Sequence, residues 1–455
     1  MKLTAFSSRK SGGKPVFLCA SAPQAGQVGE RASKFAKAAG FDGTKPVLLL
    51  IPAAAGAIDC ALLGTGADLT PMDPGRLARL LPQGDWYLAG DVRDAALATL
   101  AFALASYSFD NYRRKRVQKA RLIVPPGIDG QAITQQVEAI FLARDLINLP
   151  TNDLGPAELE AAIRTVAKQF GARVSSVVGD SLLKQNFPMV HAVGRASASP
   201  PRIVDMVWGK PGDPKVTLVG KGVCFDSGGL NIKPGDSMAL MKKDMGGAAA
   251  TLALAQMIMA ARLPVRLRLI VPAVENAISG NAFRPGDVLQ SRKGITVEIG
   301  NTDAEGRLIL GDALAWGDEE APELLLDMAT LTGAARIALG LDLPALFTDD
   351  DALAHELAGA ATRVCDPVWR LPLWPGYRKG LLSDIADISH IGKGSFGGAI
   401  TAALFLQRFV EKAKSWAHLD LYAWISAEKP WAPIGGEAQA IRAVYDVIAK
   451  RYPAK

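Results

Sequence analysis

Three polar segments in the second half of the chain hold residue types that could carry out chemistry. They span residues 221–229, with Lys233 just behind, residues 241–247, and residues 301–307. In the last segment Asp303 and Glu305 are two residues apart, so an extended backbone would project both side chains to one face. Two carboxylates on one face repel each other unless a proton or a cation lies between them. The pair predicts a shared-proton pair, a metal site or a local ion pair with Arg307, whereas the same pattern in isolation is more often a hydrated loop.

Two further carboxylates, Asp226 and Asp244, favour the metal interpretation. If the elements that carry them are adjacent, four carboxylates converge, and two divalent cations would neutralise them. The chain has four histidines, none in the paired spacing of a histidine-rich zinc site. The sequence therefore predicts a metal site built from oxygen ligands.

Two lysines, Lys221 and Lys233, accompany these acids. Nearby cations disfavour the charged form of a lysine, so one of the two can serve as a neutral nitrogen ligand while the other directs its charge at a substrate. Ordinary salt bridges with the carboxylates explain the same residues equally well. The residues alone leave both interpretations open.

Other catalytic patterns are missing from the sequence. It contains no G-x-S-x-G elbow, no G-x-x-x-x-G-K-[ST] loop and no complete dinucleotide fingerprint. Cys224 lies in an apolar context without a neighbouring histidine, which is typical of a small buried residue. The sequence therefore disfavours a serine or cysteine hydrolase and a nucleotide cofactor.

The elements that must position the three segments alternate between strands and helices. Strands are expected at residues 216–219, 265–271, 295–299 and 323–331, and helices at 246–261 and 308–316. This alternation predicts an α/β fold whose larger domain has a mixed β-sheet covered by helices on both faces. Ligands in such folds gather at the carboxyl ends of strands, where the three segments fall.

A smaller α/β domain is expected ahead of the catalytic one. Strands at 47–51 and 86–88 alternate with helices at 74–81 and 93–107, and Val124-Pro-Pro-Gly127 precedes a helical pattern at 133–147. We therefore predict a basic, non-catalytic domain over residues 1–127 and a catalytic domain over residues 128–455. The length of 455 residues suits two domains.

Composition narrows the class of protein. Hydrophobic residues make up 49% and charged residues 21%, the balance of a globular protein rather than a disordered or fibrous one. Four scattered cysteines form no disulfide framework. The first residues lack the apolar stretch of a signal peptide, and no run is long and apolar enough to span a membrane. These features predict a cytoplasmic protein without a membrane partner.

Positive charge is concentrated in the first third of the chain. Residues 1–135 carry 17 basic and 10 acidic side chains. Six of the basic residues form a cluster: Arg113, Arg114, Lys115, Arg116, Lys119 and Arg121. Such a run is usually a solvated surface, and DNA binding by this domain is the less common alternative.

The string Asn-Thr-Asp-Ala-Glu-Gly-Arg at 301–307, preceded in order by the 221–226 and 241–247 segments, resembles the leucyl aminopeptidase family of two-metal exopeptidases. The similarity extends through residues 329–334 and 397–403. It covers essentially the whole predicted catalytic domain, whereas the first third resembles the family mainly in Tyr107-x-Phe109-x-x-Tyr112. The resemblance implies a metal-dependent aminopeptidase that assembles as a homohexamer.

The resemblance also implies a role for each residue. Lys221 and Asp244 would complete the tighter metal site, Asp303 the more exchangeable one, and Asp226 and Glu305 would bridge the two metals. The catalytic residues would be Lys233, facing the substrate carbonyl oxygen, and Arg307, anchoring a bicarbonate ion as general base. Zn or Mn are the metals expected first, with Co and Mg as further candidates.

The implied chemistry explains why only N-terminal residues would be removed. Water between two divalent cations has a pKa near neutrality, and the resulting metal-bridged hydroxide attacks the peptide carbonyl. The free α-amino group of the peptide would bind the exchangeable metal, and an internal peptide bond offers no such group.

Four positions match the family's pocket for the first side chain: Met241, Thr330, Leu331 and Gly333. They imply a preference for leucine-like residues, although core packing explains Leu331 as well. Tyr422 departs from the pattern, because relatives usually carry a small residue there. A two-metal phosphoesterase is the alternative enzyme, but such sites commonly include histidines.

Overall fold

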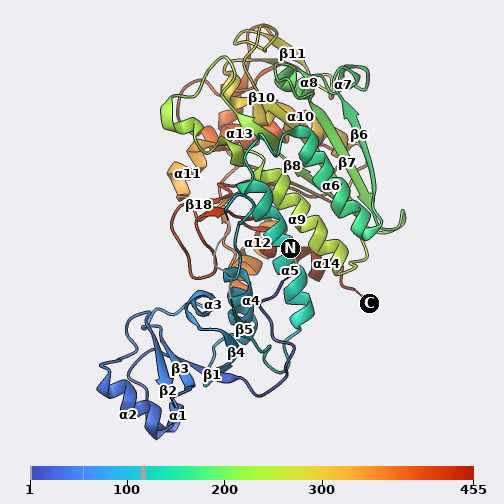
Figure 1. Ribbon diagram of the computed structural model, residues 1–455. Helices are drawn as coiled ribbons and strands as arrows, with labels where there is room; N and C mark the ends of the chain where they lie inside the picture. The colour runs from blue at the N-terminus through green and yellow to red at the C-terminus, as the bar shows by residue number, and fades with distance from the viewer. Residues whose placement is uncertain (1–2, 55, 114–118, 455) are drawn as a thin grey trace. The chain divides into compact units, whose positions relative to one another are not determined.

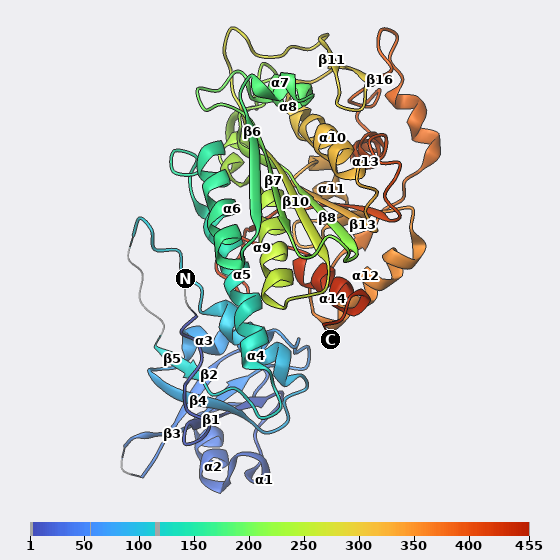
Figure 2. The same cartoon turned by 90° about the vertical axis from the view of Figure 1, so that its right-hand side faces the viewer.

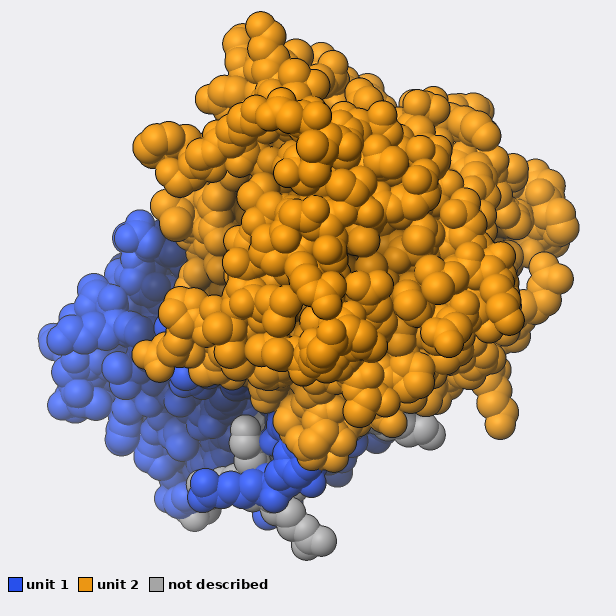
Figure 3. Space-filling model, turned by 90° about the horizontal axis from the view of Figure 1, so that it is seen from above, with its two compact units in different colours: residues 1–141, 425–434 blue, residues 142–424, 435–455 orange. Residues whose placement is uncertain are grey.

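The computed structural model describes residues 3–54, 56–113 and 119–454. It separates into two compact units, Met1–Phe141 with Ile425–Ile434, and Leu142–Trp424 with Gly435–Lys455 (Figure 3). The division falls within helix α5 (Gly130–Asn148). The boundary between residues 127 and 128 remains a prediction about independently folding domains. Three members of the basic cluster, Arg114, Lys115 and Arg116, lie outside the described residues.

Unit 1 contains a five-stranded sheet with the order β2-β3-β1-β4-β5. These strands are β1 (Lys14–Cys19), β2 (Leu48–Pro52), β3 (Ile58–Gly64), β4 (Gly84–Ala89) and β5 (Ala120–Leu122). All adjacent strands are parallel except β2, which runs antiparallel to β3. The helices are α1 (Ala25–Val28), α2 (Glu30–Ala38), α3 (Leu77–Leu80) and α4 (Ala95–Ala105). The expected small α/β domain is confirmed, although residues 73–80 form a 3-10 turn and a single helical turn rather than one helix.

Unit 2 is built on a nine-stranded sheet with the order β15-β14-β17-β13-β8-β10-β7-β6, and β9 pairs with β10. Its strands are β6 (Arg173–Val178), β7 (Arg202–Trp208), β8 (Lys215–Gly220), β9 (Gly222–Asp226), β10 (Arg266–Asn276), β13 (Leu324–Ala329), β14 (Ala345–Phe347), β15 (Trp369–Arg370) and β17 (Trp416–Asp420). Strands β17, β13, β8 and β10 are mutually parallel. Strand β7 runs antiparallel to both β10 and β6, whereas β14 is antiparallel to β17 and parallel to β15. The sheet is therefore mixed, as predicted.

Helices cover both faces of this sheet (Figures 1 and 2). One layer contains α6 (Pro156–Phe170), α9 (Gly246–Ala260) and α14 (Ile441–Arg451). The other contains α8 (Pro188–Gly194), α10 (Glu305–Asp318) and α13 (Gly398–Gln407). Strand β13 is buried along its whole length because helices pack against it from both sides. The expected two-sided helical cover is confirmed.

Smaller elements surround the sheet. Strands β11 (Val288–Gln290), β12 (Thr296–Glu298) and β16 (Ile388–Ser389) form a separate three-stranded sheet, and β18 (Trp424–Ile425) pairs with β19 (Gly435–Gly436). The remaining helices are α7 (Ser181–Lys184), α11 (Gly333–Leu339) and α12 (Asp351–Arg363). Among the helices of the described residues, none has the length and apolar character needed to cross a bilayer.

Candidate metal centre

The first two predicted site residues lie where β8 and β9 meet. Lys221 follows the last residue of β8, and its backbone N–H donates to the Met328 carbonyl 3.0 Å away. Asp226 is the last residue of β9. Both lie at the carboxyl ends of strands, where ligands bind in folds of this class.

A tight loop brings Lys233 back to Asp226. Gly228 has φ +88°, and a Cβ there would lie 2.5 Å from the Asn231 carbonyl oxygen and 2.9 Å from the Lys233 nitrogen, so glycine is required. The Lys233 backbone N–H donates to the Ser227 carbonyl at 2.9 Å. As a result, Lys233 Nζ lies 2.8 Å from Asp226 Oδ2 and also contacts Asp303 Oδ1.

The segment that carries Asp303 and Glu305 is not extended, so that expectation was wrong. Residues Thr302–Ala304 form a 3-10 turn, and α10 begins at Glu305. The Asn301 side chain accepts a hydrogen bond from the Asp303 N–H at 2.8 Å, and the Thr302 hydroxyl donates to the Gly228 carbonyl at 2.7 Å. These local and tertiary bonds favour a turn over a strand. The two carboxylates still approach the same site.

Asp244 reaches the site from the opposite layer of helices. It follows the 3-10 turn Met241–Lys243 and lies two residues before the start of α9. The Thr330 hydroxyl donates to Asp244 Oδ1 at 2.7 Å. On the other side, Gly306 lets α10 approach closely, because a Cβ there would lie 2.8 Å from Lys221 Nζ.

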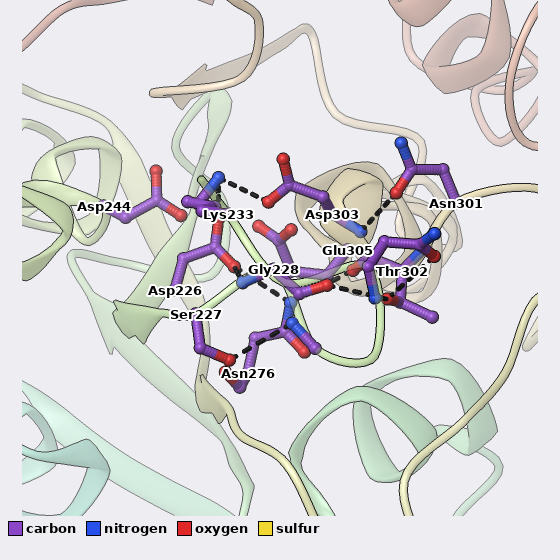
Figure 4. A network of polar contacts seen from close by, with 12 residues as sticks. Asp226, Ser227, Gly228, Lys233, Asp244, Asn276, Asn301, Thr302, Asp303 and Glu305 are labelled. Carbon is purple, nitrogen blue, oxygen red and sulfur yellow. Dashed lines mark hydrogen bonds and ion pairs between the residues drawn. The ribbon is translucent and has the colours of Figure 1, made fainter. Parts of the chain in front are cut away.

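The carboxylates converge as predicted (Figure 4). Asp226, Asp244 and Glu305 each place one oxygen within 4.8 Å of the others, and all three residues are buried. Lys221 Nζ lies 2.7 Å from Asp244 Oδ2 and 2.9 Å from Glu305 Oε1. Asp303 is joined to the group through Lys233. The structure thus brings together six of the seven residues predicted as metal ligands or catalytic residues. The seventh, Arg307, forms no hydrogen bond or ion pair with the other six, all of them described residues.

Burial and mutual repulsion strain this group of charges. Burial, reinforced by the Asp226 carboxylate, raises the pKa of Glu305 to about 8. Burial raises the pKa of Asp303 and that of Asp244 in the same way, and Asp226 adds to both shifts. Burial alone would lower the pKa of Lys221, but the Asp244 and Glu305 carboxylates outweigh it and raise the pKa. The carboxylates are therefore costly in their ionised form without additional positive charge.

The donor set fits divalent cations. Among the described residues, the buried oxygens Asp244 Oδ2, Glu305 Oε1 and Asp303 Oδ1 have no neutral hydrogen-bond donor and contact only lysine ammonium groups. Within this described part of the chain their only partners are thus the ammonium groups of Lys221 and Lys233, so that two lysine charges face four carboxylates. Several carboxylate oxygens around one small space are the ligands that hard divalent cations prefer. The assignment of each residue as a ligand remains a prediction.

Arg307 lies in the first turn of α10 and, among the described residues, is hydrogen-bonded to His390 rather than to the carboxylates. Its Nη1 donates to the His390 carbonyl at 2.7 Å, and its buried Nε has no hydrogen-bond partner among the described residues. Burial lowers the pKa of Arg307 to about 10. The guanidinium is thus a buried cation with an unused donor.

Of the four predicted pocket residues, Thr330 contacts Asp244 directly. Met241 and Leu331 are half-buried, Thr330 is buried against Asp244, and Gly333 is exposed at the start of α11. Leu331 is held by its N–H, which donates to Asp420 Oδ1 at 2.9 Å.

Tyr422 is enclosed by two cations that the sequence did not single out. Lys243 Nζ lies 4.6 Å from the centre of its ring, and the Arg336 guanidinium lies 5.4 Å from it. Lys243 Nζ is buried and lacks a hydrogen-bond partner among the described residues. Burial lowers the pKa of Lys243 to about 7.

Sequence reasoning missed several residues that hold the ligands. Asn276 Nδ2 donates to Asp226 Oδ1 at 2.9 Å and to the Thr302 carbonyl at 3.0 Å. Asp420 Oδ2 accepts a hydrogen bond from the Thr332 hydroxyl at 2.6 Å, which fixes the loop after β13. Asn276 and Asp420 are the last residues of their strands, and this position was the available signal.

Comparison with models of known protein families identifies the family of this chain. Residues 141–445 match the model described as the cytosol aminopeptidase family, catalytic domain. The chain belongs to the cytosol aminopeptidase family. Residues 25–125 match the M17 aminopeptidase, N-terminal domain. The predicted resemblance is confirmed, and the protein is an aminopeptidase, a hydrolase of peptide bonds from a metal-dependent family.

Individual aminopeptidases support this membership. A probable cytosol aminopeptidase from Syntrophotalea carbinolica is 40% identical, over 76% of this chain and 73% of its own length. The crystal structure of a cytosol aminopeptidase from Coxiella burnetii has a TM-score of 0.93 and 47% identity, covering 98% of both chains. The bottromycin maturation enzyme BotP in complex with Mn has a TM-score of 0.86 and 34% identity, covering 97% of this chain and all of that one (100%).

Proposed function

We propose that this aminopeptidase removes leucine-like residues from the N-terminus of peptides, using two divalent cations held by the carboxylate cluster. The observation that carries the proposal is the convergence of Asp226, Asp244 and Glu305 oxygens within 4.8 Å, beside Lys221. Two bound cations would lower the pKa of water to near neutrality and so supply the nucleophile.

The proposed ligands keep the roles implied by the family resemblance. Lys221 and Asp244 complete one metal site, Asp303 completes the other, and Asp226 and Glu305 serve both. Lys221 is charged among the carboxylates, but neighbouring cations would disfavour that charge and leave its nitrogen free to act as a ligand. The hydrogen bond from Asn276 fixes the orientation of Asp226 for this task.

Lys233 and Arg307 are the proposed catalytic residues. The Lys233 side chain is only 12% exposed and holds its ammonium between Asp226 and Asp303, close to where a peptide carbonyl would approach. Its charge would stabilise the negative charge that develops on the carbonyl oxygen. Arg307 has a buried positive charge and a free donor, which suits an anion such as the bicarbonate expected as general base.

The side-chain preference depends on the pocket residues. Met241, Thr330, Leu331 and Gly333 would surround the first side chain, and their mixture of apolar and small groups suits a leucine-like residue. Tyr422 would form one wall of this pocket, because Lys243 and Arg336 hold its ring in place.

The remaining properties are proposed on narrower grounds. Mn or Zn are the metals proposed first, since the similar BotP structure is a complex with Mn, and Co and Mg also suit oxygen ligands. The names of the relatives support a cytoplasmic location. A homohexamer is proposed from the family resemblance. Phe396 and Ile337, which are 94% and 90% exposed in the single chain, fit self-association in general. No specific observation favours DNA binding or phosphoesterase activity, and we do not propose either.

The first experiment measures release of p-nitroaniline from L-leucine p-nitroanilide. Chelated protein is reconstituted with Mn or Zn and compared on the same substrate carrying an N-acetyl group. We expect metal-dependent cleavage of the free-amine substrate alone, and its loss in Lys233→Met. Lys412→Ala, which alters an exposed lysine, is the matched control and should retain activity. Equal cleavage of the acetylated substrate, or full activity of Lys233→Met, would refute the proposal.

A further inference from the structure

A polar groove of about 450 Å³ lies in unit 2 at the opposite end of the sheet from the metal centre. It includes Trp416, the first residue of β17, which pairs with Leu325 near the start of the parallel strand β13. The metal centre lies beyond the far ends of these strands, about 17 Å away for a five-residue strand. The groove is therefore separate from the site proposed for peptide hydrolysis, and a ligand bound in it would not depend on that function.

Positive charge dominates the groove. Four cations line it, Lys293, Arg378, Arg408 and Lys414, against two acids, Asp349 and Glu411. Glu411 is already neutralised by Lys293, whose Nζ lies 2.7 Å from Glu411 Oε1. The side chains that line the groove therefore carry an excess of positive charge.

The two arginines are the groups without a carboxylate partner. Arg378 Nη2 donates to the neutral Gln407 amide oxygen at 2.9 Å, and the Gln407 nitrogen in turn donates to Asp349 Oδ2 at 3.0 Å. Neither Arg378 nor Arg408 forms an ion pair within the part of the chain that the structure describes. The pKa of Glu411 is lowered by Lys293 and, more weakly, by the Arg408 charge, which also adds to the hydrogen bonds from Thr296 that lower the pKa of Asp387. Both guanidinium groups therefore lack a carboxylate in direct contact among the described residues, and each keeps N–H donors that an anion from solution could use.

One wall of the groove is fixed before any ligand arrives. The buried Asp318 carboxylate accepts hydrogen bonds from the backbone N–H groups of Glu411, Lys412 and Ala413, at 2.9, 2.9 and 2.7 Å. This bonding holds residues 411–413 in one conformation. A ligand would not need to order this segment, which lowers the cost of binding.

We propose that this groove binds a small phosphorylated anion. Arginine forks bind phosphate oxygens through pairs of parallel hydrogen bonds, and two of them suit a chain of linked phosphates. The volume falls within the range of small-molecule sites. Ile295 and Val410 supply an apolar edge that an organic group attached to the phosphates would cover.

Isothermal titration calorimetry with sodium tripolyphosphate and with ATP tests the proposal. Both are titrated into the full-length protein, metal-loaded and metal-stripped, because phosphates also bind metals directly. We expect binding in both forms, weakened at least tenfold in Arg378→Ala/Arg408→Ala. If ATP binds more tightly than tripolyphosphate, the site is assigned to a nucleotide. If the two bind equally, the site is assigned to a plain phosphate chain.

The matched control removes the same charge elsewhere. Lys168→Ala/Lys184→Ala deletes two exposed lysines outside the groove and should bind within twofold of the unmodified protein. Thermal melts check that both double variants fold, and Arg378→Lys/Arg408→Lys replaces the first if it does not. Absence of binding at millimolar tripolyphosphate, binding only in the metal-loaded form, or equal weakening in the lysine control would overturn the proposal.

Discussion

His390 should make the stability of the protein depend on pH. The ring is fully buried, and burial, with the nearby Arg307 charge, lowers its pKa to about 4 from an ordinary 6.5. Its Nε2 lies 2.8 Å from the Asn301 carbonyl, so it donates, while Nδ1 accepts from the Gly300 N–H at 3.2 Å. The neutral ring satisfies both bonds. Protonation would add a second N–H to the ring, at Nδ1, which would break the bond from Gly300 and leave only the Glu298 carbonyl, 3.2 Å away, to accept it. Burial and the Arg307 charge oppose this added positive charge.

The direction of the effect is set by the two pKa values. The folded pKa lies below the unfolded one, so the stabilisation is complete above pH 6.5 and is lost as the pH falls toward 4. A difference of about 2.5 pKa units corresponds to about 3 kcal/mol of unfolding free energy. The buried carboxylate Glu305, with its raised pKa, changes stability in the opposite sense, so the contribution of His390 must be isolated by substitution.

The assay is urea unfolding of chelated protein, followed by tryptophan fluorescence between pH 7.5 and 4.5. His390→Gln keeps a donor and an acceptor but cannot be protonated, so it should lose about 2.5 kcal/mol less than the unmodified protein over this range, which stops just above the folded pKa. His355→Gln alters an exposed histidine and should behave like the unmodified protein. Parallel pH curves for His390→Gln and the unmodified protein would refute the reasoning.

Three further outcomes are expected. Mn at 100 times its Kd should stabilise the protein by about 2.7 kcal/mol, which a thermal melt records as a rise in melting temperature. Glu305→Gln should show a smaller rise, and a rise equal to that of the unmodified protein would contradict the assignment of Glu305 as a ligand. Gly228→Ala should cost about 1–3 kcal/mol in a thermal melt, because its φ is +88° and the site is crowded, whereas Gly212→Ala, with open space around it, should cost little. In Tyr422→Ala, the kcat/KM for leucine p-nitroanilide divided by that for alanine p-nitroanilide should increase. An unchanged ratio would contradict the proposal that Tyr422 forms part of the pocket wall.

The sequence predicted the features that depend on strand ends and missed those that depend on distant partners. Asp226 could be placed because it closes an apolar strand, and strand ends meet at one edge of a sheet. The conformation of Asp303 was predicted wrongly, because bonds from Thr302 to the Gly228 loop select a turn and no local pattern encodes them. The enclosure of Tyr422 by Lys243 was missed for the same reason, since the two residues are far apart in the chain.

Unit 1 is built from two stretches of chain that are far apart in the sequence, and this affects how the protein folds during synthesis. Residues 425–434 belong to this unit, and within it Arg79 Nη2 donates to the Lys429 carbonyl at 2.6 Å while Arg79 Nη1 lies 3.1 Å from Glu428. A ribosome needs about 15–60 s to reach these residues after it completes residue 141. Residues 1–141 are therefore made well before residues 425–434, which complete the same unit. A fragment that stops at residue 127 or 141 would lack part of the internal packing of this unit.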